Sequence, residues 1–196
     1  VQTCALPILE FLKSKGINIH YNHPLKAVNF RNKMISTLVF DDQNWDLKKN
    51  DIVILTVPAW VAKSLIPDLM APTEYSPIVN VHYKIEASEK VPPILGIING
   101  HSEWIFSFRN RLSVTISAAE QYLNIERKDL AIIIWNEIKL VTGLKAELPP
   151  WQIVKERRAT FKASSSQNAL RPQARTDWKN LFLAGDWRSE EHTSEL

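Results

Sequence analysis

"NLFLAGDW", Asn180–Trp187, joins a short apolar run to a turn of small residues. The run Leu181–Leu183 lacks the alternation of a half-exposed strand, and this predicts a strand that is buried on both faces. Gly185 allows the main chain to come close to a ligand, and Asp186 can accept hydrogen bonds from ribose-type hydroxyl groups. Because open α/β sheets bind nucleotides at the carboxyl ends of their strands, we predict a nucleotide site here; an ordinary strand-to-turn junction is the alternative.

A second apolar run, "DIVILTVP", occupies Asp51–Pro58 and has the same continuous character. It predicts another strand that is buried on both faces, and Pro58 ends it. The residues on either side predict shorter elements. These are a helix at 8–15, half-buried strands at 17–22, 25–30 and 33–40, a turn at Arg31–Asn32, and a short helix at 59–67.

The middle of the chain has a different pattern. "IVNVHYKIE", Ile78–Glu86, alternates between apolar and polar residues, which predicts an antiparallel strand with one face on a core or cavity. Glu126–Thr142 has helical spacing and is followed by Gly143, a common C-terminal stop. The apolar stripe of this helix consists of Leu130, Ile133, Ile134, Ile138 and Val141. Further strands are predicted at 93–100, 103–108, 111–119 and 151–161, and a polar loop at 164–176.

These patterns predict a mixed α/β (α+β) fold that contains two kinds of sheet. The buried-strand signatures lie in 9–58 and 151–187, and they indicate two parts of one nucleotide-binding domain. The segment between them, 59–150, indicates an inserted substrate domain with an antiparallel sheet and a helix.

The two ends of the chain share an unusual origin. "RSEEHTSEL", 188–196, is the translation of one strand of a common sequencing-library adapter, and "VQTCALPI", 1–8, is the translation of the opposite strand. We therefore expect both segments to be adapter artefact and the natural segment to be about 9–187, an internal piece of a longer protein. Cys4, the single cysteine, lies in the first of these segments, so we predict no disulfide and no cysteine metal site.

The composition argues against several classes of partner. The formal net charge of +3 is small and scattered, without the basic blocks that nucleic-acid binding needs. This charge favours an anionic membrane surface only weakly, and no apolar run reaches the roughly 20 residues that span a bilayer. His20, His23, His82 and His101 lack metal-ligand spacing, and His82 falls on the polar face of its strand, where we expect exposure. We predict no nucleic-acid partner and no metal.

Several stretches resemble known flavoenzymes. "ILTVPAW", Ile54–Trp60, and "LFLAGDW", Leu181–Trp187, resemble two flavin-binding elements of the FAD-dependent amine oxidase and phytoene desaturase superfamily. "PIVNVHYKIE", "PILGIINGHSEWIFSF", "LSVTISAAEQYL" and the block Pro149–Trp187 resemble, more narrowly, the hydroxysqualene dehydroxylase family. This resemblance runs in order over nearly all of 9–187, and its most specific part is the block Pro149–Trp187.

The resemblance implies FAD, held non-covalently by a split, Rossmann-like domain whose parts are 9–58 and 151–187. The residues it implies at the cofactor are Leu25, through its main chain, Val57, Pro58, Ala184, Gly185 and Asp186. The family usually has valine where Leu25 stands, and a main-chain contact tolerates this change. The glycine-rich phosphate-binding segment of the family is absent from the sequence. We therefore expect the chain not to hold FAD alone, and to expose beside its buried strands an apolar patch larger than an intact monomer shows.

The resemblance also implies an oxidoreductase of bacterial hopanoid biosynthesis, in the cytoplasm or at the surface of the inner membrane. In the implied reaction, hydroxysqualene loses water, and a hydride from reduced flavin quenches the resulting cation to give squalene. Trp104, Phe106 and Phe108 share a strand face and are predicted to line the cavity for this long apolar isoprenoid, although core aromatic residues would have the same spacing. Two other functions stay open: a carotenoid or phytoene desaturase or amine oxidase of the same fold, and a lipid-binding module without flavin.

Overall fold

The computed structural model describes residues 2–86 and 91–189. Of the two predicted adapter segments, the first residue and 190–196 lie outside the described part. The rest of the first segment belongs to helix α1, Gln2–Ser14, which ends just before Gly16. Gly16 has a φ of +73°, the left-handed conformation that commonly ends a helix, as predicted.

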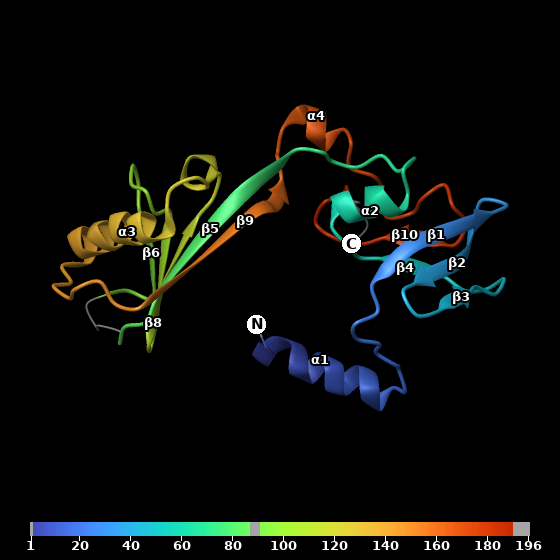
Figure 1. Ribbon diagram of the computed structural model, residues 1–196, viewed down its shortest axis with the longest axis horizontal. Helices are drawn as coiled ribbons and strands as arrows, with labels where there is room; N and C mark the ends of the chain where they lie inside the picture. The colour runs from blue at the N-terminus through green and yellow to red at the C-terminus, as the bar shows by residue number, and fades with distance from the viewer. Residues whose placement is uncertain (1, 87–90, 190–196) are drawn as a thin grey trace, which may run out of the picture. The chain divides into compact units, whose positions relative to one another are not determined.

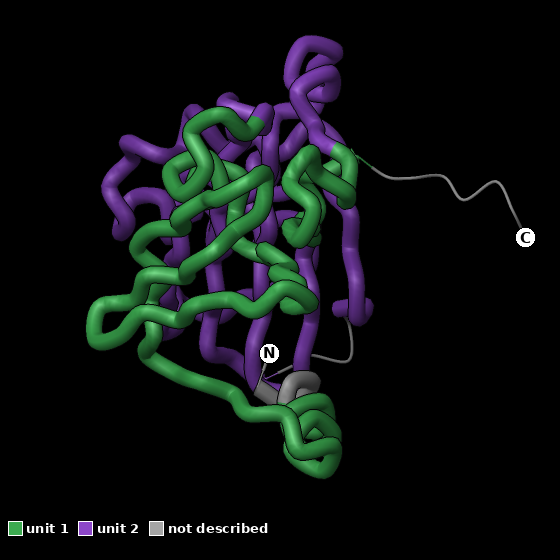
Figure 2. Tube along the Cα trace, turned by 90° about the vertical axis from the view of Figure 1, so that its right-hand side faces the viewer, with its two compact units in different colours: residues 1–69, 173–196 green, residues 70–172 purple. Residues whose placement is uncertain are grey.

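The chain forms two compact units, which Figure 2 shows in different colours. Unit 1 contains residues 1–69 and 173–196, and unit 2 contains residues 70–172. The strand at 151–161, which we predicted in the nucleotide-binding part, belongs to unit 2. It forms a long antiparallel ladder with β5, Tyr75–Tyr83, and the pattern of a strand does not specify which partner it will have. The boundaries predicted after residues 58 and 150 therefore differ from those of the compact units.

Unit 1 contains a three-stranded antiparallel sheet and a two-stranded parallel sheet (Figure 1). The first has the order β1-β2-β3, with β1 at Leu25–Arg31, β2 at Met34–Phe40 and β3 at Asn44–Asp46. The second pairs β4, Val53–Leu55, with β10, Leu181–Leu183; helix α2, Ala59–Leu65, follows β4. The predictions of a helix after Pro58 and of strands at both places are confirmed.

Two local predictions in unit 1 are wrong. The turn between β1 and β2 is at Asn32–Lys33, one residue later than predicted, and both residues have positive φ, +53° and +57°. A two-residue turn of this kind matches the twist of the strands that it joins, and this determines the register. Within the described residues no strand forms at 17–22; the ring of His20 instead packs against Trp45, with the ring centroids 5.1 Å apart.

The two strands of the parallel pair are covered to different extents. In β10, Leu181 and Leu183 are almost completely buried. In β4, Leu55 is buried, but Ile54 is 64% exposed and the preceding Ile52 is 63% exposed. The prediction that this strand is buried on both faces is wrong for this chain, because β4 has one hydrogen-bonded neighbour and one covered face. Exposed apolar side chains are therefore present at this strand, while the apolar patch larger than that of an intact monomer stays a prediction.

Asn180 connects the two sheets of unit 1. Its buried side chain accepts a hydrogen bond from the main-chain N–H of Ile35 at 2.8 Å and donates one to the carbonyl of Ile35 at 2.9 Å. These bonds satisfy a buried main-chain donor and acceptor on β2. The main-chain carbonyl of Asn180 also accepts a hydrogen bond from Val53 N at 2.8 Å, so one residue contacts both β2 and β4.

Unit 2 is built on a five-stranded antiparallel sheet with helix α3, Arg127–Thr142, on one face (Figure 1). The strand order is β6-β7-β8-β5-β9. Besides β5, the strands are β6 at Ile94–Gly96, β7 at Trp104–Phe108, β8 at Arg111–Ile116 and β9 at Trp151–Phe161, and a 3-10 turn, η1, forms at Glu120–Tyr122. Each strand overlaps a predicted range, so the antiparallel sheet and its helix are confirmed.

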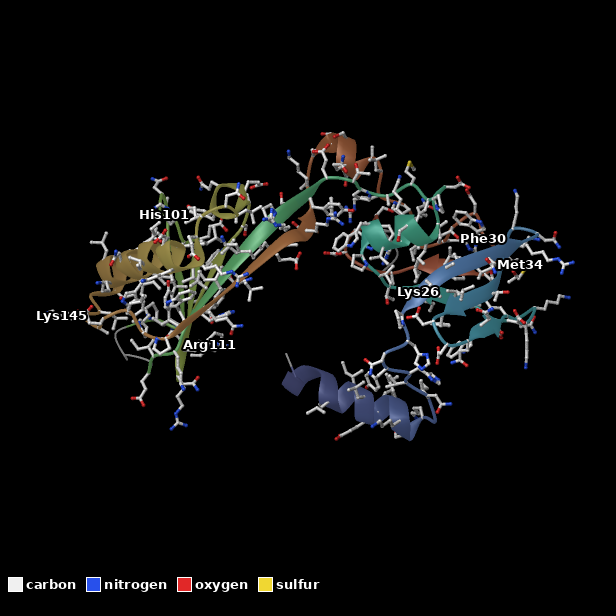
Figure 3. All side chains as sticks on the ribbon, viewed as in Figure 1. Lys26, Phe30, Met34, His101, Arg111 and Lys145 are labelled. Atoms are coloured by element: carbon white, nitrogen blue, oxygen red, sulfur yellow. The ribbon has the colours of Figure 1, made fainter. Side chains whose placement is uncertain are left out.

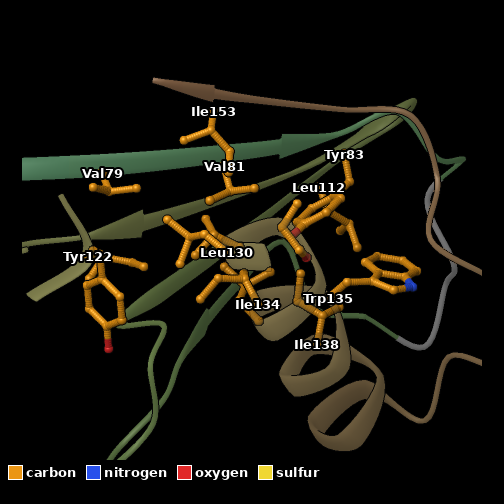
Figure 4. Close-up of a cluster of buried hydrophobic side chains, with 14 of the residues drawn as sticks. Val79, Val81, Tyr83, Leu112, Tyr122, Leu130, Ile134, Trp135, Ile138 and Ile153 are labelled. Atoms are coloured by element: carbon orange, nitrogen blue, oxygen red, sulfur yellow. The ribbon is translucent and has the colours of Figure 1, made fainter. Parts of the chain in front are cut away.

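The core of unit 2 lies between α3 and one face of this sheet. Figure 4 shows Leu130, Ile134 and Ile138 of α3 packed toward the sheet, and all three are fully buried. The assignment of Val141 to the same stripe is wrong, because this residue lies in the last turn of α3 and is 42% exposed. Trp135 was missed: it is buried, and its indole N–H donates a hydrogen bond of 3.2 Å to a carbonyl in the segment after α3. The sheet residues of this core are Val79, Val81, Tyr83, Ile105, Leu112, Val114, Ile116 and Ile153.

Local hydrogen bonds determine where the helices of unit 2 begin and end. At the start of α3 the Glu126 carboxylate accepts a hydrogen bond from a main-chain N–H of the first turn, and after its end Gly143 has a φ of +72°. The predicted helix is therefore confirmed to within one residue. The predicted polar loop 164–176 is wrong at its start, where α4, Ser165–Asn168, forms because the Ser164 hydroxyl caps it.

Replacing Asn180 by alanine is expected to lower the free energy of unfolding by about 2–3 kcal/mol, since it leaves the N–H and carbonyl of Ile35 buried without partners. Urea titration measures the change, and faster hydrogen exchange at the Ile35 amide locates it in unit 1. The matched control is Asn44→Ala, an exposed asparagine on β3 of the same unit, with an expected change of about 0.5 kcal/mol or less. Equal effects of the two substitutions would show that Asn180 does not hold the sheets together.

Candidate functional site

The carboxyl ends of β4 and β10 lie side by side in unit 1. The strands run parallel with Leu55 opposite Leu183, and the N–H of Ala184 donates a hydrogen bond of 3.0 Å to the carbonyl of Leu55. The segments that follow, Thr56–Pro58 and Ala184–Asp186, therefore leave the sheet at the same edge. The structure thus brings together five of the six residues predicted at the cofactor: Val57, Pro58, Ala184, Gly185 and Asp186.

Trp187 holds the two segments together, and the sequence patterns did not reveal this role. Its side chain is 4% exposed, and its indole N–H donates a hydrogen bond of 2.9 Å to the carbonyl of Val57. Gly185 has a φ of +135°, and a Cβ atom there would lie only 3.1 Å from the indole nitrogen. Glycine is therefore required at 185 both by the backbone conformation and by the packing of Trp187.

The edge of the parallel pair has the properties of a site for the phosphate and ribityl parts of a dinucleotide. Pro58, Gly185 and Asp186 are exposed, while Leu55 and Leu183, the last residues of the two strands, are buried. A ligand at this edge can reach main-chain groups through a glycine that carries no side chain, and a carboxylate lies next to it. These features fit a flavin dinucleotide.

Leu25, the sixth predicted residue, lies in the other sheet of unit 1. It is the first residue of β1, is half-buried and pairs with Phe40; the side chain of its neighbour Lys26 is labelled in Figure 3. Helix α2, which follows Pro58, packs against β1. The contact of the Leu25 main chain with a cofactor stays a prediction.

The three predicted cavity aromatics lie on the open face of the sheet of unit 2, opposite α3. Ile105, between them in β7, is fully buried in the core, so Trp104, Phe106 and Phe108 point the other way. Trp104 is 48% exposed, Phe108 is 46% exposed, and Phe106 is half-buried. The alternative that these three are core aromatics is therefore wrong for unit 2, while their role toward a substrate stays a prediction.

The same open face carries two hydrogen-bonded polar pairs. His82 Nδ1 lies 2.9 Å from Ser113 Oγ, and the Thr115 hydroxyl donates a hydrogen bond of 2.8 Å to Asn80 Oδ1. Burial, together with the positive charge of Arg111, lowers the pKa of His82 below its ordinary value, which favours the neutral imidazole. The prediction that His82 is exposed is wrong: its position opposite Ser113 in the strand pairing leaves it half-buried.

His82 also lines a pocket of about 340 Å³ at one end of this sheet. Lys84, Arg111 and Gln152 line the pocket as well, and the side chain of Arg111 is labelled in Figure 3. The guanidinium of Arg111 lies over the ring of Phe108, 4.6 Å from its centroid, so polar and aromatic surfaces meet here.

Within residues 2–86 and 91–189, no group of three or more histidine, cysteine, aspartate or glutamate side chains is placed to hold a metal ion. Among the helices of the same described ranges, none is long and apolar enough to cross a membrane.

Curated proteins similar to this chain include hydroxysqualene dehydroxylases. The one from Zymomonas mobilis is 43% identical over 181 residues, and the one from Rhodopseudomonas palustris is 44% identical over 182 residues. Each match covers 92% of this chain and 44% of the relative, so the chain spans less than half the length of these relatives. A 15-cis-phytoene desaturase from Glycine max is 21% identical over 221 residues, covering 97% of this chain and 38% of the relative.

Solved structures of low sequence identity share the fold. An L-proline dehydrogenase from P. horikoshii matches with a TM-score of 0.64 at 14% identity, covering 87% of this chain and 46% of that one. An iminodiacetate oxidase from Chelativorans sp. BNC1 matches with a TM-score of 0.62 at 13% identity, covering 93% of this chain and 48% of that one. These likenesses confirm the predicted mixed α/β fold class. Residues 6–194 match the family described as flavin containing amine oxidoreductase, and the chain belongs to that family.

Proposed function

We propose that the chain is part of an FAD-dependent oxidoreductase that reductively removes the hydroxyl group of hydroxysqualene to give squalene, a step of hopanoid biosynthesis. The observation that carries the proposal is the difference in similarity between two groups of relatives. Identity to the hydroxysqualene dehydroxylases is roughly twice the identity to the phytoene desaturases, over a similar share of the chain. Membership of a flavin-containing family supports the cofactor.

The residues proposed to hold FAD are those at the carboxyl edge of β4 and β10. The exposed main chain at Gly185 would meet the pyrophosphate, and Asp186 would accept hydrogen bonds from the ribityl hydroxyl groups. Val57, Pro58 and Ala184 would line the same edge, and the main chain of Leu25 would meet the adenine. FAD, when bound and reduced, supplies the hydride for the reaction.

Unit 2 is proposed to bind the substrate, with Trp104, Phe106 and Phe108 against its hydrocarbon chain. These side chains would exclude water, and their ring faces would stabilise positive charge that develops on the chain. Because the substrate is a lipid, we also propose that the enzyme works in the bacterial cytoplasm as a peripheral protein of the inner membrane. Failure of the complete protein to co-sediment with vesicles of anionic phospholipid would contradict this location.

The complete protein that contains this chain is expected to convert hydroxysqualene to squalene when reduced flavin is present. Gas chromatography with mass spectrometry measures the product, and phytoene serves as the comparison substrate. Conversion of phytoene but not of hydroxysqualene would favour the desaturase alternative. A purified complete protein that has no flavin absorbance and binds no added FAD would favour a lipid-binding module.

Gly185→Ala in the complete protein is expected to lower FAD affinity about tenfold, because a side chain strains the backbone at φ +135° and displaces Trp187. Flavin absorbance after dialysis against graded FAD concentrations measures the affinity. Gly143→Ala is the matched control, since Gly143 also has a positive φ of +72° but lies in unit 2 with open space around it. It is expected to cost about 1 kcal/mol of stability and to leave FAD affinity unchanged. Equal loss of FAD in both variants would contradict the assigned site.

A further inference from the structure

The open face of the sheet of unit 2 is divided into an apolar half and a hydrogen-bonding half. The apolar half lies on β6 and β7 and consists of Ile94, Trp104, Phe106 and Phe108. The hydrogen-bonding half lies on β8 and β5 and consists of the pairs Ser113–His82 and Thr115–Asn80. A face of this kind suits a ligand that is mostly hydrocarbon and carries one polar group.

The strand register places the two halves next to each other. Phe106 of β7 lies opposite Ser113 of β8, and Ser113 lies opposite His82 of β5, so the three form one row across adjacent strands. Neighbouring strands are about 4.8 Å apart, so the row spans roughly 10 Å. One extended molecule lying along this row can contact the phenyl ring and the imidazole at once.

The two polar pairs differ in what they leave for a ligand. Thr115 and Asn80 satisfy each other through one direct hydrogen bond. In the other pair, Ser113 engages Nδ1 of His82, and Nε2 makes no hydrogen bond to any residue that the structure describes. His82 is half-buried and lines the pocket at the end of the sheet. Its imidazole is therefore held by Ser113 with one nitrogen left for an external partner.

We infer that His82, oriented by Ser113, binds the hydroxyl group of a long-chain alcohol whose hydrocarbon lies against Trp104 and Phe106. This inference rests on the proposed function, because the proposed substrate and product differ in that hydroxyl group. An aromatic wall alone binds both molecules, whereas a hydrogen bond to the hydroxyl favours the substrate and is lost when the product forms. Ser113 acts as a positioning residue, since it orients the imidazole and does not itself meet the ligand.

The test uses the complete enzyme with hydroxysqualene as substrate and squalene as product inhibitor. His82→Phe is expected to raise the KM for hydroxysqualene about tenfold and to leave the inhibition constant of squalene within about twofold. His82→Gln keeps a hydrogen-bonding nitrogen and is expected to restore most of the affinity. Trp104→Ala removes apolar contact and is expected to weaken the binding of hydroxysqualene and of squalene to the same extent. Thr115→Val, the matched control on the same face, is expected to change neither constant by more than about twofold.

Ser113→Ala provides a second measurement if His82→Phe fails to fold. It leaves the imidazole in place without its partner and is expected to raise the KM for hydroxysqualene severalfold while the inhibition constant of squalene is unchanged. An unchanged KM in either variant, or an equal rise of both constants, would overturn the inference. If the unaltered enzyme forms no squalene, the proposed function itself has failed, and this result is distinct from a failure of the His82 assignment.

Discussion

The parallel pairing of β4 with β10 is the constraint on which unit 1 depends. It joins Val53–Leu55 to Leu181–Leu183, and the whole of unit 2 lies between them in the sequence. Each strand has only three residues, so the ladder itself supplies few hydrogen bonds against the entropy of closing so long a loop. Two side chains next to β10 add hydrogen bonds that hold it in place. Asn180, just before the strand, bonds to Ile35 of β2, and Trp187, after the strand, bonds to the carbonyl of Val57.

The packing of Trp187 requires glycine at position 185, independently of the proposed cofactor. Glycines at nucleotide sites are usually explained by the close approach of a ligand. Here the packing of Trp187 already requires a residue without Cβ, before any ligand is considered. The fold therefore prepares the exposed edge in advance, and a cofactor would meet main-chain groups that need no rearrangement.

Much of this arrangement was predicted from local sequence patterns, and the features that were not predicted have a common physical cause. The alternation in β5 and the spacing of α3 predicted both elements, since each pattern is set by residues a few positions apart. The strand at 151–161 was predicted, but its pairing with β5 in unit 2 was not, because strand partners are chosen by contacts far apart in sequence. Asn180, Trp187 and the His82–Ser113 pair were missed for the same reason. The five predicted cofactor residues that lie at one edge follow apolar strand segments, which leave a local signal, and the family resemblance pointed to the same places.

The proposed substrate and product differ in polarity, and this difference bears on the role inferred for the open face of unit 2. Squalene is more apolar than hydroxysqualene, so a purely aromatic wall would hold the product more tightly than the substrate, since burying a hydroxyl without a partner costs about 1–3 kcal/mol. A hydrogen bond to that hydroxyl offsets this cost and is absent once the product has formed. Ser113 engages one imidazole nitrogen, and burial lowers the pKa of His82, which favours the neutral ring. The inferred bond therefore would not add the cost of burying a charged ring beside hydrocarbon. If the proposed function holds, the hydrogen bond inferred for His82 would shift the preference of this surface from product toward substrate.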